Sequence, residues 1–439
     1  MLDLSYNTIV VLLGTALLGA GAGLVGSFSV LRGRALIGDV IAHAALPGLC
    51  LAFLIAGRKN LTPLLIGALA TGTLSVLLLT VLRRYTRVKD DALLGTIRSV
   101  FFGAGIVLIT YIQNRSTEGS KAGLTSYILG KTAGMVAADV QLIGGVALAA
   151  LVCIVLLYKE LRLASFDPGF ARVQGWPALL LDNVQMTLAA LITIVGLPAV
   201  GAVLVAAMLI LPPVTMRFWT DRLSKLLVGS AIIGAAIGGL GTLTSAQYSL
   251  LPTGPVIVLV GTAFFVVSML FAPRRGILAR AAALRDFRRM LLRQRILSAL
   301  YEYGEGPTSE DAWLTEAEIA ATFDITPAAA RHAINDAVFG GTLVPRSSAK
   351  GTEYGLTDAG WDHAALVVRG ERLWQRYLVE HPDLAGQLVD LDLTNIDDYL
   401  PADVIRKLEA SLAAEGRLPE TFESAASQAS VARRQGGRP

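Results

Sequence analysis

The sequence has 439 residues, of which 54% are hydrophobic and 16% charged, with a formal net charge of +4 at pH 7. Long apolar runs fill the chain to about residue 279, and frequent charges follow, which predicts a membrane domain and then a soluble domain. Both cysteines lie in apolar runs, which excludes a disulfide framework and a zinc ribbon.

Nine apolar segments of the first part are long enough, or nearly so, for the roughly 20 residues that a membrane-spanning helix requires. They lie near residues 8–30, 36–57, 62–82, 92–112, 134–157, 178–196, 198–216, 226–244 and 254–272, with only "GLP" between the sixth and the seventh. Runs such as "GSAIIGAAIGGLGT" predict closely packed helices, unless they reflect a general composition bias. The predicted fold of residues 1–273 is an all-α polytopic membrane protein with about nine transmembrane helices.

Basic residues are concentrated in the loops after the third, fifth, seventh and ninth segments, with Arg83, Lys159 and Arg222 among them. Basic loops remain on the cytoplasmic side of a membrane. The N-terminus is therefore expected outside the cell membrane and the C-terminus inside. The stretch "GRKN" at 57–60 would lie outside and is a minor exception to this pattern.

The second segment contains "GDVIAHAALPG", residues 38–48, with two ionisable side chains where lipid disfavours them. Asp39 and His43 are four residues apart and therefore share one face of a helix. A carboxylate and an imidazole together suit Zn, Fe or Mn. Pro47 has no N–H and leaves the His43 carbonyl without its helical partner, while Gly38 and Gly48 permit a local helix break or a close helix contact. The alternative is structural, with Asp39 capping the helix and His43 bonding to a neighbouring helix.

The stretch "RALIGDVIAHAALPGLCLAF" resembles the signature of the manganese/zinc/iron permeases of ATP-binding-cassette (ABC) importers. Four further motifs resemble that family in the same order: "DDALLGTIRSVFFGAGIVLI", "KELRLASFDPGFARVQGWP", "VGLPAVGAVLVAAMLILPPVTMRFWTDRLSK" and "PTGPVIVL". The resemblance implies that Asp39 and His43 line the path of a transported Mn²⁺, Zn²⁺ or Fe²⁺, with no permanently bound cofactor. It also implies a second permease subunit, ABC ATPase subunits on the cytoplasmic face and an extracytoplasmic metal-binding protein.

The loop from Lys159 to Pro177 is the segment that the resemblance assigns to docking of the ATPase. Within it, the residues of interest are Phe166, Asp167, Pro168, Phe170 and Gly175. "FDP" predicts a turn or a helix start, followed by a short amphipathic stretch. The alternative is an ordinary solvated loop. The chain itself is not expected to be an enzyme, because "LGKT" at 129–132 has Thr125 where a phosphate-binding loop needs glycine.

Residues 274–295 contain eight arginines and one aspartate, which predicts a juxtamembrane segment attracted by anionic lipid, or more weakly a nucleic-acid contact. Residues 296–365 have the pattern of a winged helix-turn-helix, an α+β fold common in DNA-binding proteins. "DITP" is the predicted turn, and Thr326 with Pro327 a predicted helix start. The side chains available for DNA or partner contact are Arg331, His332, Asn335, Arg346 and Lys350.

Residues 290–412 are similar to the diphtheria-toxin-repressor family of metal-dependent regulators, with 366–418 as a helical dimerisation-like region and 419–439 as a disordered tail. The chain departs from that family, because residues 371–375 contain no histidine where regulatory metal ligands are expected. Residues 296–439 carry 12 Lys and Arg against 23 Asp and Glu, which opposes DNA binding. A regulatory or interaction module is the favoured interpretation. A membrane-tethered, metal-responsive transcriptional regulator is the alternative for the whole chain.

Overall fold

The computed structural model describes residues 5–56, 61–115, 130–248, 251–273, 275–304, 313–381, 396 and 400–419. Packing within the chain divides it into two compact units, Met1–Arg280 and Ala281–Pro439. The division lies inside one long helix, α13 (Ile277–Gly304). The predicted tail lies outside the described residues from 420 onward.

Within the described part of the first unit, eight helices are long and apolar enough to cross a membrane. They are α1 (Tyr6–Leu31), α2 (Ile37–Ala56), α3 (Leu61–Tyr85), α4 (Asp90–Arg115), α6 (Ala137–Leu156), α9 (Ala178–Val200), α11 (Leu223–Gln247) and α12 (Thr253–Phe271). The seventh predicted span is α10 (Ala202–Arg217), whose 16 residues fall short of the roughly 20 that a span requires. The chain is a multi-pass membrane protein.

The predicted boundary between the sixth and seventh segments was wrong in position. "GLP" lies inside α9, which continues through Pro198 to Val200. The break is at Gly201, whose φ of +88° lies in the region that favours glycine. A glycine is needed at that turn because side-chain-bearing residues are strained at such a φ.

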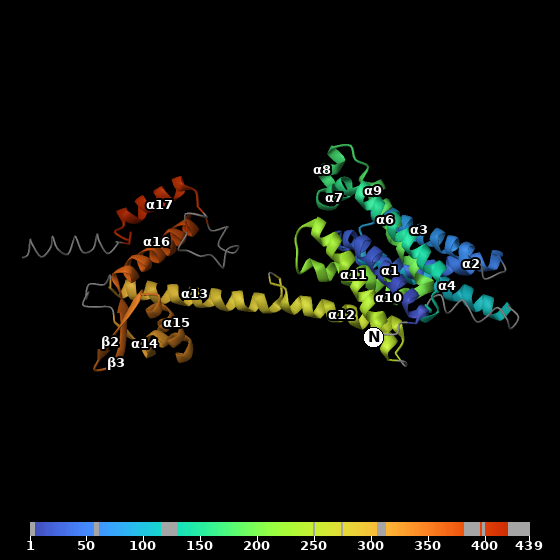
Figure 1. The fold of residues 1–439 in the computed structure, drawn as a ribbon. Helices are drawn as coiled ribbons and strands as arrows, with labels where there is room; N and C mark the ends of the chain where they lie inside the picture. The colour runs from blue at the N-terminus through green and yellow to red at the C-terminus, as the bar shows by residue number, and fades with distance from the viewer. Residues whose placement is uncertain are drawn as a thin grey trace, which may run out of the picture. The chain divides into compact units, whose positions relative to one another are not determined.

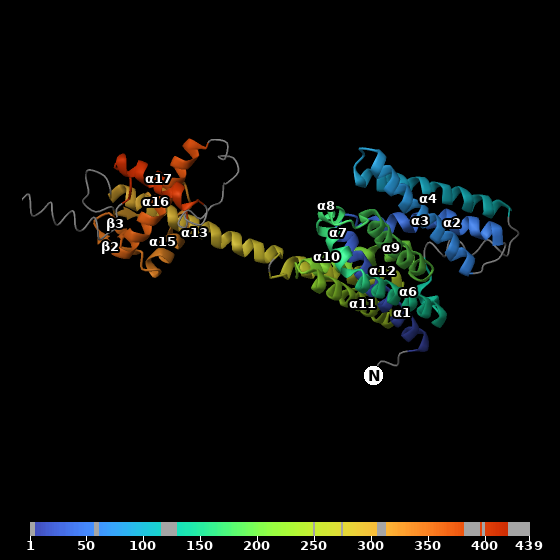
Figure 2. The ribbon, with the colours of Figure 1, turned by 90° about the horizontal axis from the view of Figure 1, so that it is seen from above.

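Close glycine contacts hold the first unit together. α1 packs against α11, α10, α6 and α9, and α2 packs against α3 and α4 at one edge of the unit (Figures 1 and 2). Where α1 crosses α11, Gly19 faces the backbone of Gly234. The Thr15 hydroxyl donates to the Gly238 carbonyl across the same contact, at 3.1 Å. The small residues therefore lie at helix crossings, as the packing interpretation predicts and a mere composition bias does not.

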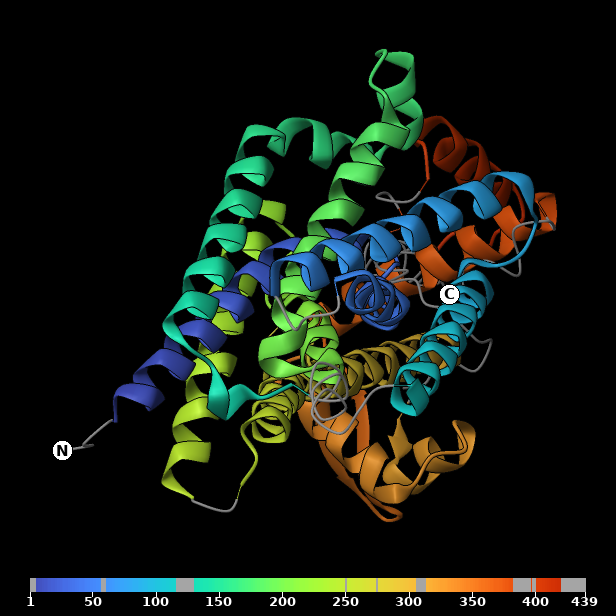
Figure 3. The ribbon, with the colours of Figure 1, turned by 90° about the vertical axis from the view of Figure 1, so that its right-hand side faces the viewer.

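Two short helices, α7 (Tyr158–Phe166) and α8 (Pro168–Val173), connect α6 to α9. Figures 1 and 3 show them projecting beyond the ends of these two helices. A 3₁₀ turn, η2 (Thr132–Gly134), precedes α6. The two short helices α7 and α8 therefore form a separate segment at the end of α6.

The second unit is built on the end of α13 and a small antiparallel sheet. Its elements are β1 (Leu314–Thr315), α14 (Glu316–Thr322), α15 (Pro327–Phe339), β2 (Leu343–Ser348), β3 (Gly351–Leu356), α16 (Asp358–Glu380) and α17 (Ala402–Ala414). The sheet order is β1-β3-β2, and Arg346 is the register partner of Glu353. The succession of two helices and a hairpin has the order expected of a winged helix-turn-helix.

Local sequence explains the helix starts of this unit. Thr326 accepts a hydrogen bond from the backbone of Ala329, and Pro327 follows it as the first helical residue. Asp324, in the turn before α15, has a φ of +50°. The core joins α13, α14, α15 and α16, with Tyr301 of α13 fully buried. A second, smaller cluster joins α16 to α17 through Leu373 and Leu408.

Candidate functional site

Helix α2 brings Asp39 and His43 together on one face in its first two turns. The Nδ1 of His43 lies 2.8 Å from the backbone oxygen of Asp39 and 3.3 Å from its Oδ1. The side chains are 17% exposed for His43 and 20% for Asp39, so both are mostly buried. The predicted pairing on one helical face is therefore present in the fold.

The geometry assigns the two ring nitrogens of His43 different roles. A carbonyl oxygen only accepts, so Nδ1 carries the hydrogen in its contact with the Asp39 backbone, and in the neutral ring Nε2 keeps a lone pair. Ligating histidines usually have their other ring nitrogen held by such a contact. Oδ1 of Asp39 lies on the Nδ1 side of the ring, so one of the two side chains must turn before Nε2 and the carboxylate can bind the same ion. The spacing of Asp39 and His43 in the sequence does not reveal this division.

Arg98 of α4 is a third member of the site, and the sequence analysis missed it. Its Nη1 lies 2.9 Å from Oδ2 of Asp39, and its side chain is 51% exposed. The guanidinium therefore forms an ion pair with Oδ2 of Asp39, whereas Oδ1 is the oxygen nearer to Nδ1 of His43. A signal was available in the sequence, because Arg98 is the one charged residue in the predicted fourth span, where lipid disfavours charge.

The surroundings of His43 are apolar. Its ring contacts Phe102 edge to face, with the centroids 5.1 Å apart. The small pocket that it lines is otherwise formed by Ala42, Leu46, Leu49, Phe102, Leu197 and Ala202. Among the described residues, no group of three or more His, Cys, Asp or Glu side chains is placed to hold a metal ion. One chain thus offers a cation two ligand side chains and an apolar wall.

Of the two possibilities at Gly38 and Gly48, a helix break or a close helix contact, the structure shows the contact. α2 is continuous from Ile37 to Ala56, with Pro47 inside it. Gly38 instead allows a close contact with the Leu209 side chain of α10, and Gly48 approaches the backbone of Gly67 on α3. Pro47 removes one backbone hydrogen bond from α2. The contacts with α3 and α10 support the helix at this point, and it continues without a break.

The segment between α6 and α9 has the local structure that its sequence predicts. Asp167 caps α8 by accepting from the Phe170 backbone at 2.8 Å, and Pro168 is the first helical residue. Gly175, with a φ of +81°, ends the segment. Phe166 is 61% exposed and Phe170 49%, so aromatic surface faces outward. Exposed aromatic side chains on a short capped helix suit a contact with another protein.

In the second unit, acidic partners neutralise both predicted contact arginines. Arg331 of α15 pairs with Glu316 at 3.0 Å, and Arg346 on β2 pairs with Glu353 at 3.2 Å. The Arg346 guanidinium also lies 4.1 Å from the ring centroid of Trp313. The remaining predicted contacts, His332, Asn335 and Lys350, are exposed. Their ion pairs leave Arg331 and Arg346 less positive charge to offer to DNA phosphates.

The chain was compared with known proteins. Residues 5–272 match the model of the ABC 3 transport family. The manganese transport system membrane protein MntC of Bacillus subtilis (strain 168) is 36% identical over 417 residues, 94% of this chain and 93% of that protein. The zinc transport system membrane protein TroC of Treponema pallidum (strain Nichols) is 40% identical over 294 residues, 67% of this chain and 95% of that protein.

Among solved structures, a chain of PsaBC from Streptococcus pneumoniae in complex with Fab matches with a TM-score of 0.55 and 30% identity. The match covers 64% of this chain and 96% of that one. The first relative extends over both units described above, whereas the second relative and the solved structure match about two thirds of this chain.

Proposed function

Because the chain belongs to the ABC 3 transport family, we propose that it is the permease subunit of an ATP-driven importer of a divalent transition metal ion, Mn²⁺, Zn²⁺ or Fe²⁺. The observation that carries the proposal is the similarity over nearly the whole chain to a relative named as a manganese transport membrane protein. A relative named for zinc transport supports the same class of cargo. The ion is a transported substrate and not a resident cofactor.

The ion passes His43 and Asp39 in this proposal. Nε2 of His43 is the first ligand, because it keeps a lone pair and its ring is oriented by the contact of Nδ1 with Asp39. The Asp39 carboxylate becomes available once Arg98 leaves it. Arg98 is half exposed and long, so it can move aside without opening the helix packing. Until then its positive charge neutralises Asp39 in the absence of cargo.

A second permease subunit completes the path. One aspartate and one histidine are too few for an ion that prefers four or more ligands. A two-fold axis between two subunits would supply two carboxylates and two imidazoles. The shortage of ligands within the described part of one chain supports this pairing.

The remaining partners follow from orientation. With basic loops inside, α7 and α8 face the cytoplasm, and ABC ATPase subunits dock on Phe166, Phe170 and the capped start of α8. ATP hydrolysis takes place on those subunits. An extracytoplasmic binding protein delivers the ion to the opposite face.

The second unit acts as a cytoplasmic regulatory module. Its helix-turn-helix and hairpin are of the winged-helix type, yet Arg331 and Arg346 are already paired with glutamates. A transport relative that matches only two thirds of this chain supports a role outside the transport path itself. We therefore favour regulation or assembly over transcriptional control. A chain ending at Arg280, at the division between the units, should still transport metal in vesicles with its partner subunits.

The experiment that tests the main proposal is metal uptake by cells that express the full system, measured separately with Mn, Zn and Fe. Asp39→Ala and His43→Ala should each abolish uptake while the protein remains in the membrane. Asp91→Ala is the matched control, because Asp91 is an exposed acidic residue at the start of α4. Normal uptake by both site variants would exclude this path. Operator DNA bound by the full chain in a metal-dependent way would favour the alternative, a membrane-tethered regulator.

A further inference from the structure

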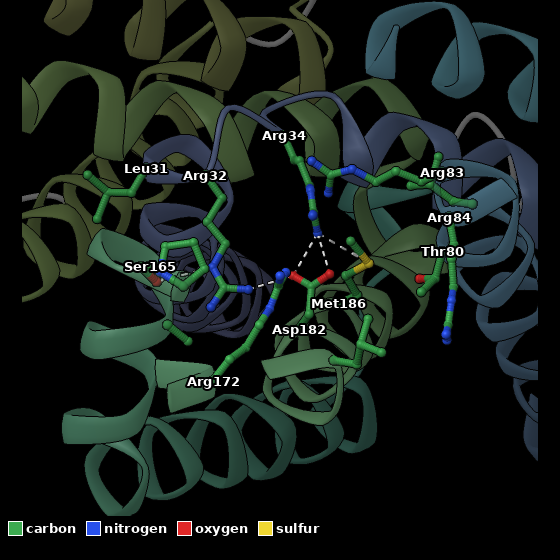
Figure 4. Close-up of a pocket in the computed structure, with 14 residues that line it drawn as sticks. Leu31, Arg32, Arg34, Thr80, Arg83, Arg84, Ser165, Arg172, Asp182 and Met186 are labelled. Carbon is green, nitrogen blue, oxygen red and sulfur yellow. Dashed lines mark hydrogen bonds and ion pairs between the residues drawn. The ribbon is translucent and has the colours of Figure 1, made fainter. Parts of the chain in front are cut away.

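A second polar cavity lies in the first unit, away from Asp39 and His43. Its volume is about 810 Å³. It is formed at the ends of α1 and α3, the start of α9 and the connection between α7 and α8, and Figure 4 shows its lining residues. The lining residues are Leu31, Arg32, Arg34, Leu79, Thr80, Arg83, Arg84, Ala164, Ser165, Pro168, Arg172, Leu179, Asp182 and Met186. Five of them are arginines and only one is acidic, so the cavity is strongly cationic.

Asp182 neutralises only part of this charge. Arg32 donates to its Oδ1 at 2.5 Å, and Arg34 donates to both of its oxygens at 2.7 and 2.8 Å. In Figure 4, Arg172 also extends toward Asp182, and Arg83 extends toward Arg34. Two guanidinium groups therefore share one carboxylate. Of the other three, Arg83 is paired with Asp90 at 2.8 Å, whereas Arg84 and Arg172 make no ion pair with a described residue.

Arg32 lines this cavity, and one donor of its guanidinium, the buried Nη2, is unused within the described part of the chain. Its side chain is only 9% exposed, and its buried Nη2 has no hydrogen-bond partner among the described residues. Burial lowers the pKa of the Arg32 guanidinium below its usual range, although the nearby Asp182 carboxylate acts in the opposite direction. A buried cation with a free N–H is costly unless an anion accepts from it. An anion in the cavity toward which the Arg32 guanidinium turns would supply the missing acceptor.

We propose that this cavity binds a phosphate group, carried by an anionic phospholipid or present as free phosphate. Arginine's planar array of donors matches phosphate oxygens, and several arginines can share one phosphate. The cavity is larger than a phosphate ion requires, and Leu31, Leu79 and Leu179 line it as well. Apolar walls beside guanidinium groups at the ends of spanning helices favour a lipid headgroup with its glycerol.

Such a ligand would connect separate parts of the fold. Arg172 comes from α8, Arg83 from α3 and Arg32 from the end of α1. A phosphate held by all three ties the α7–α8 segment to two spanning helices. This site is independent of the metal path, because no lining residue is shared with the pocket beside His43.

The test uses the purified full-length chain with two probes. Native mass spectrometry measures retention of phosphatidylglycerol against phosphatidylcholine, and thermal unfolding is followed in inorganic phosphate against chloride of equal ionic strength. The variants are Arg172→Gln, which is exposed and has no ion pair with a described residue, and the double variant Arg83→Gln/Arg172→Gln. Arg217→Gln/Arg222→Gln is the matched control, because both arginines are exposed and lie outside the cavity.

The wild type should retain phosphatidylglycerol selectively, or be stabilised by phosphate, and the control should behave like it. The double variant should bind at least about tenfold more weakly, since hydrogen bonds to charged groups are lost. Selective retention of the lipid identifies a headgroup site, and stabilisation by phosphate alone identifies a free-phosphate site. If the double variant fails to fold, the single variant Arg172→Gln is compared with the wild type instead, and it should bind the probe more weakly. The proposal would be overturned if the cavity variants bound both probes as strongly as the wild type. It would also be overturned if the wild type bound neither probe.

Discussion

The variant Gly234→Ala, which adds one methyl group where α1 crosses α11, should lower the stability of the first unit. A Cβ at Gly234 would lie 2.6 Å from the carbonyl carbon of Gly19. Carbon atoms in contact are about 3.5–4.0 Å apart, so the two helices would have to separate by about 1 Å. Overpacking of this kind costs about 1–3 kcal/mol. The same helix offers an internal control at Gly239, where a Cβ would meet nothing within 4 Å.

The comparison of two alanine variants isolates the steric effect. Alanine is favoured over glycine in a helix by about 1 kcal/mol, and this gain applies equally to Gly234→Ala and Gly239→Ala. The difference between the variants is therefore the cost of the crossing, about 1–3 kcal/mol. At about 2–4 °C per kcal/mol, Gly234→Ala should unfold several degrees below Gly239→Ala in detergent. An unfolding temperature for Gly234→Ala equal to or above that of Gly239→Ala would refute the reasoning.

Three other outcomes are expected. Arg98→Ala should leave folding intact, because the side chain is half exposed. It should change the metal concentration at which uptake is half-maximal, and an unchanged concentration would show that Arg98 has no role in the path. Phe170→Asp should uncouple ATP hydrolysis from uptake without lowering the unfolding temperature, and full uptake by this variant would place the ATPase elsewhere. Burial raises the pKa of Glu371 above 4.5, so stability is lost as pH rises through the raised pKa. Glu371→Gln should therefore unfold at a higher temperature than wild type at pH 7, with the pH-dependent part of this advantage gone below about pH 4. A gain that persists unchanged in acid would contradict that account.

Much of the fold could be read from the residues alone because lipid imposes a simple rule on composition. Long apolar runs are needed for spanning helices, so the membrane part and most of its helices were predictable. Local chemistry likewise predicted the cap at Asp167 and the start of α15 at Pro327. These features depend on neighbours in sequence, since a cap or a first-turn proline acts within one helical turn.

In the candidate site, the pair within α2 could be predicted from the sequence, but the contact with Arg98 of α4 could not. The spacing of Asp39 and His43 fixed their common face, because a helix repeats every 3.6 residues. Their partner Arg98 lies on another helix, and no spacing rule relates the two segments. The continuity of α2 through Pro47 likewise depends on contacts with α3 and α10.

By itself, the sequence determined which segments enter the membrane, which residues share a helical face and which local caps form, because these depend on composition and short-range geometry. Only the tertiary structure decided that Asp39 is paired with Arg98, that the ring of His43 lines an apolar pocket and that five arginines line one cavity. Those arrangements depend on which helices cross and at what depth. Helix crossing is set by long-range packing of small residues such as Gly19 and Gly234, which have no effect on local structure that would reveal their partners.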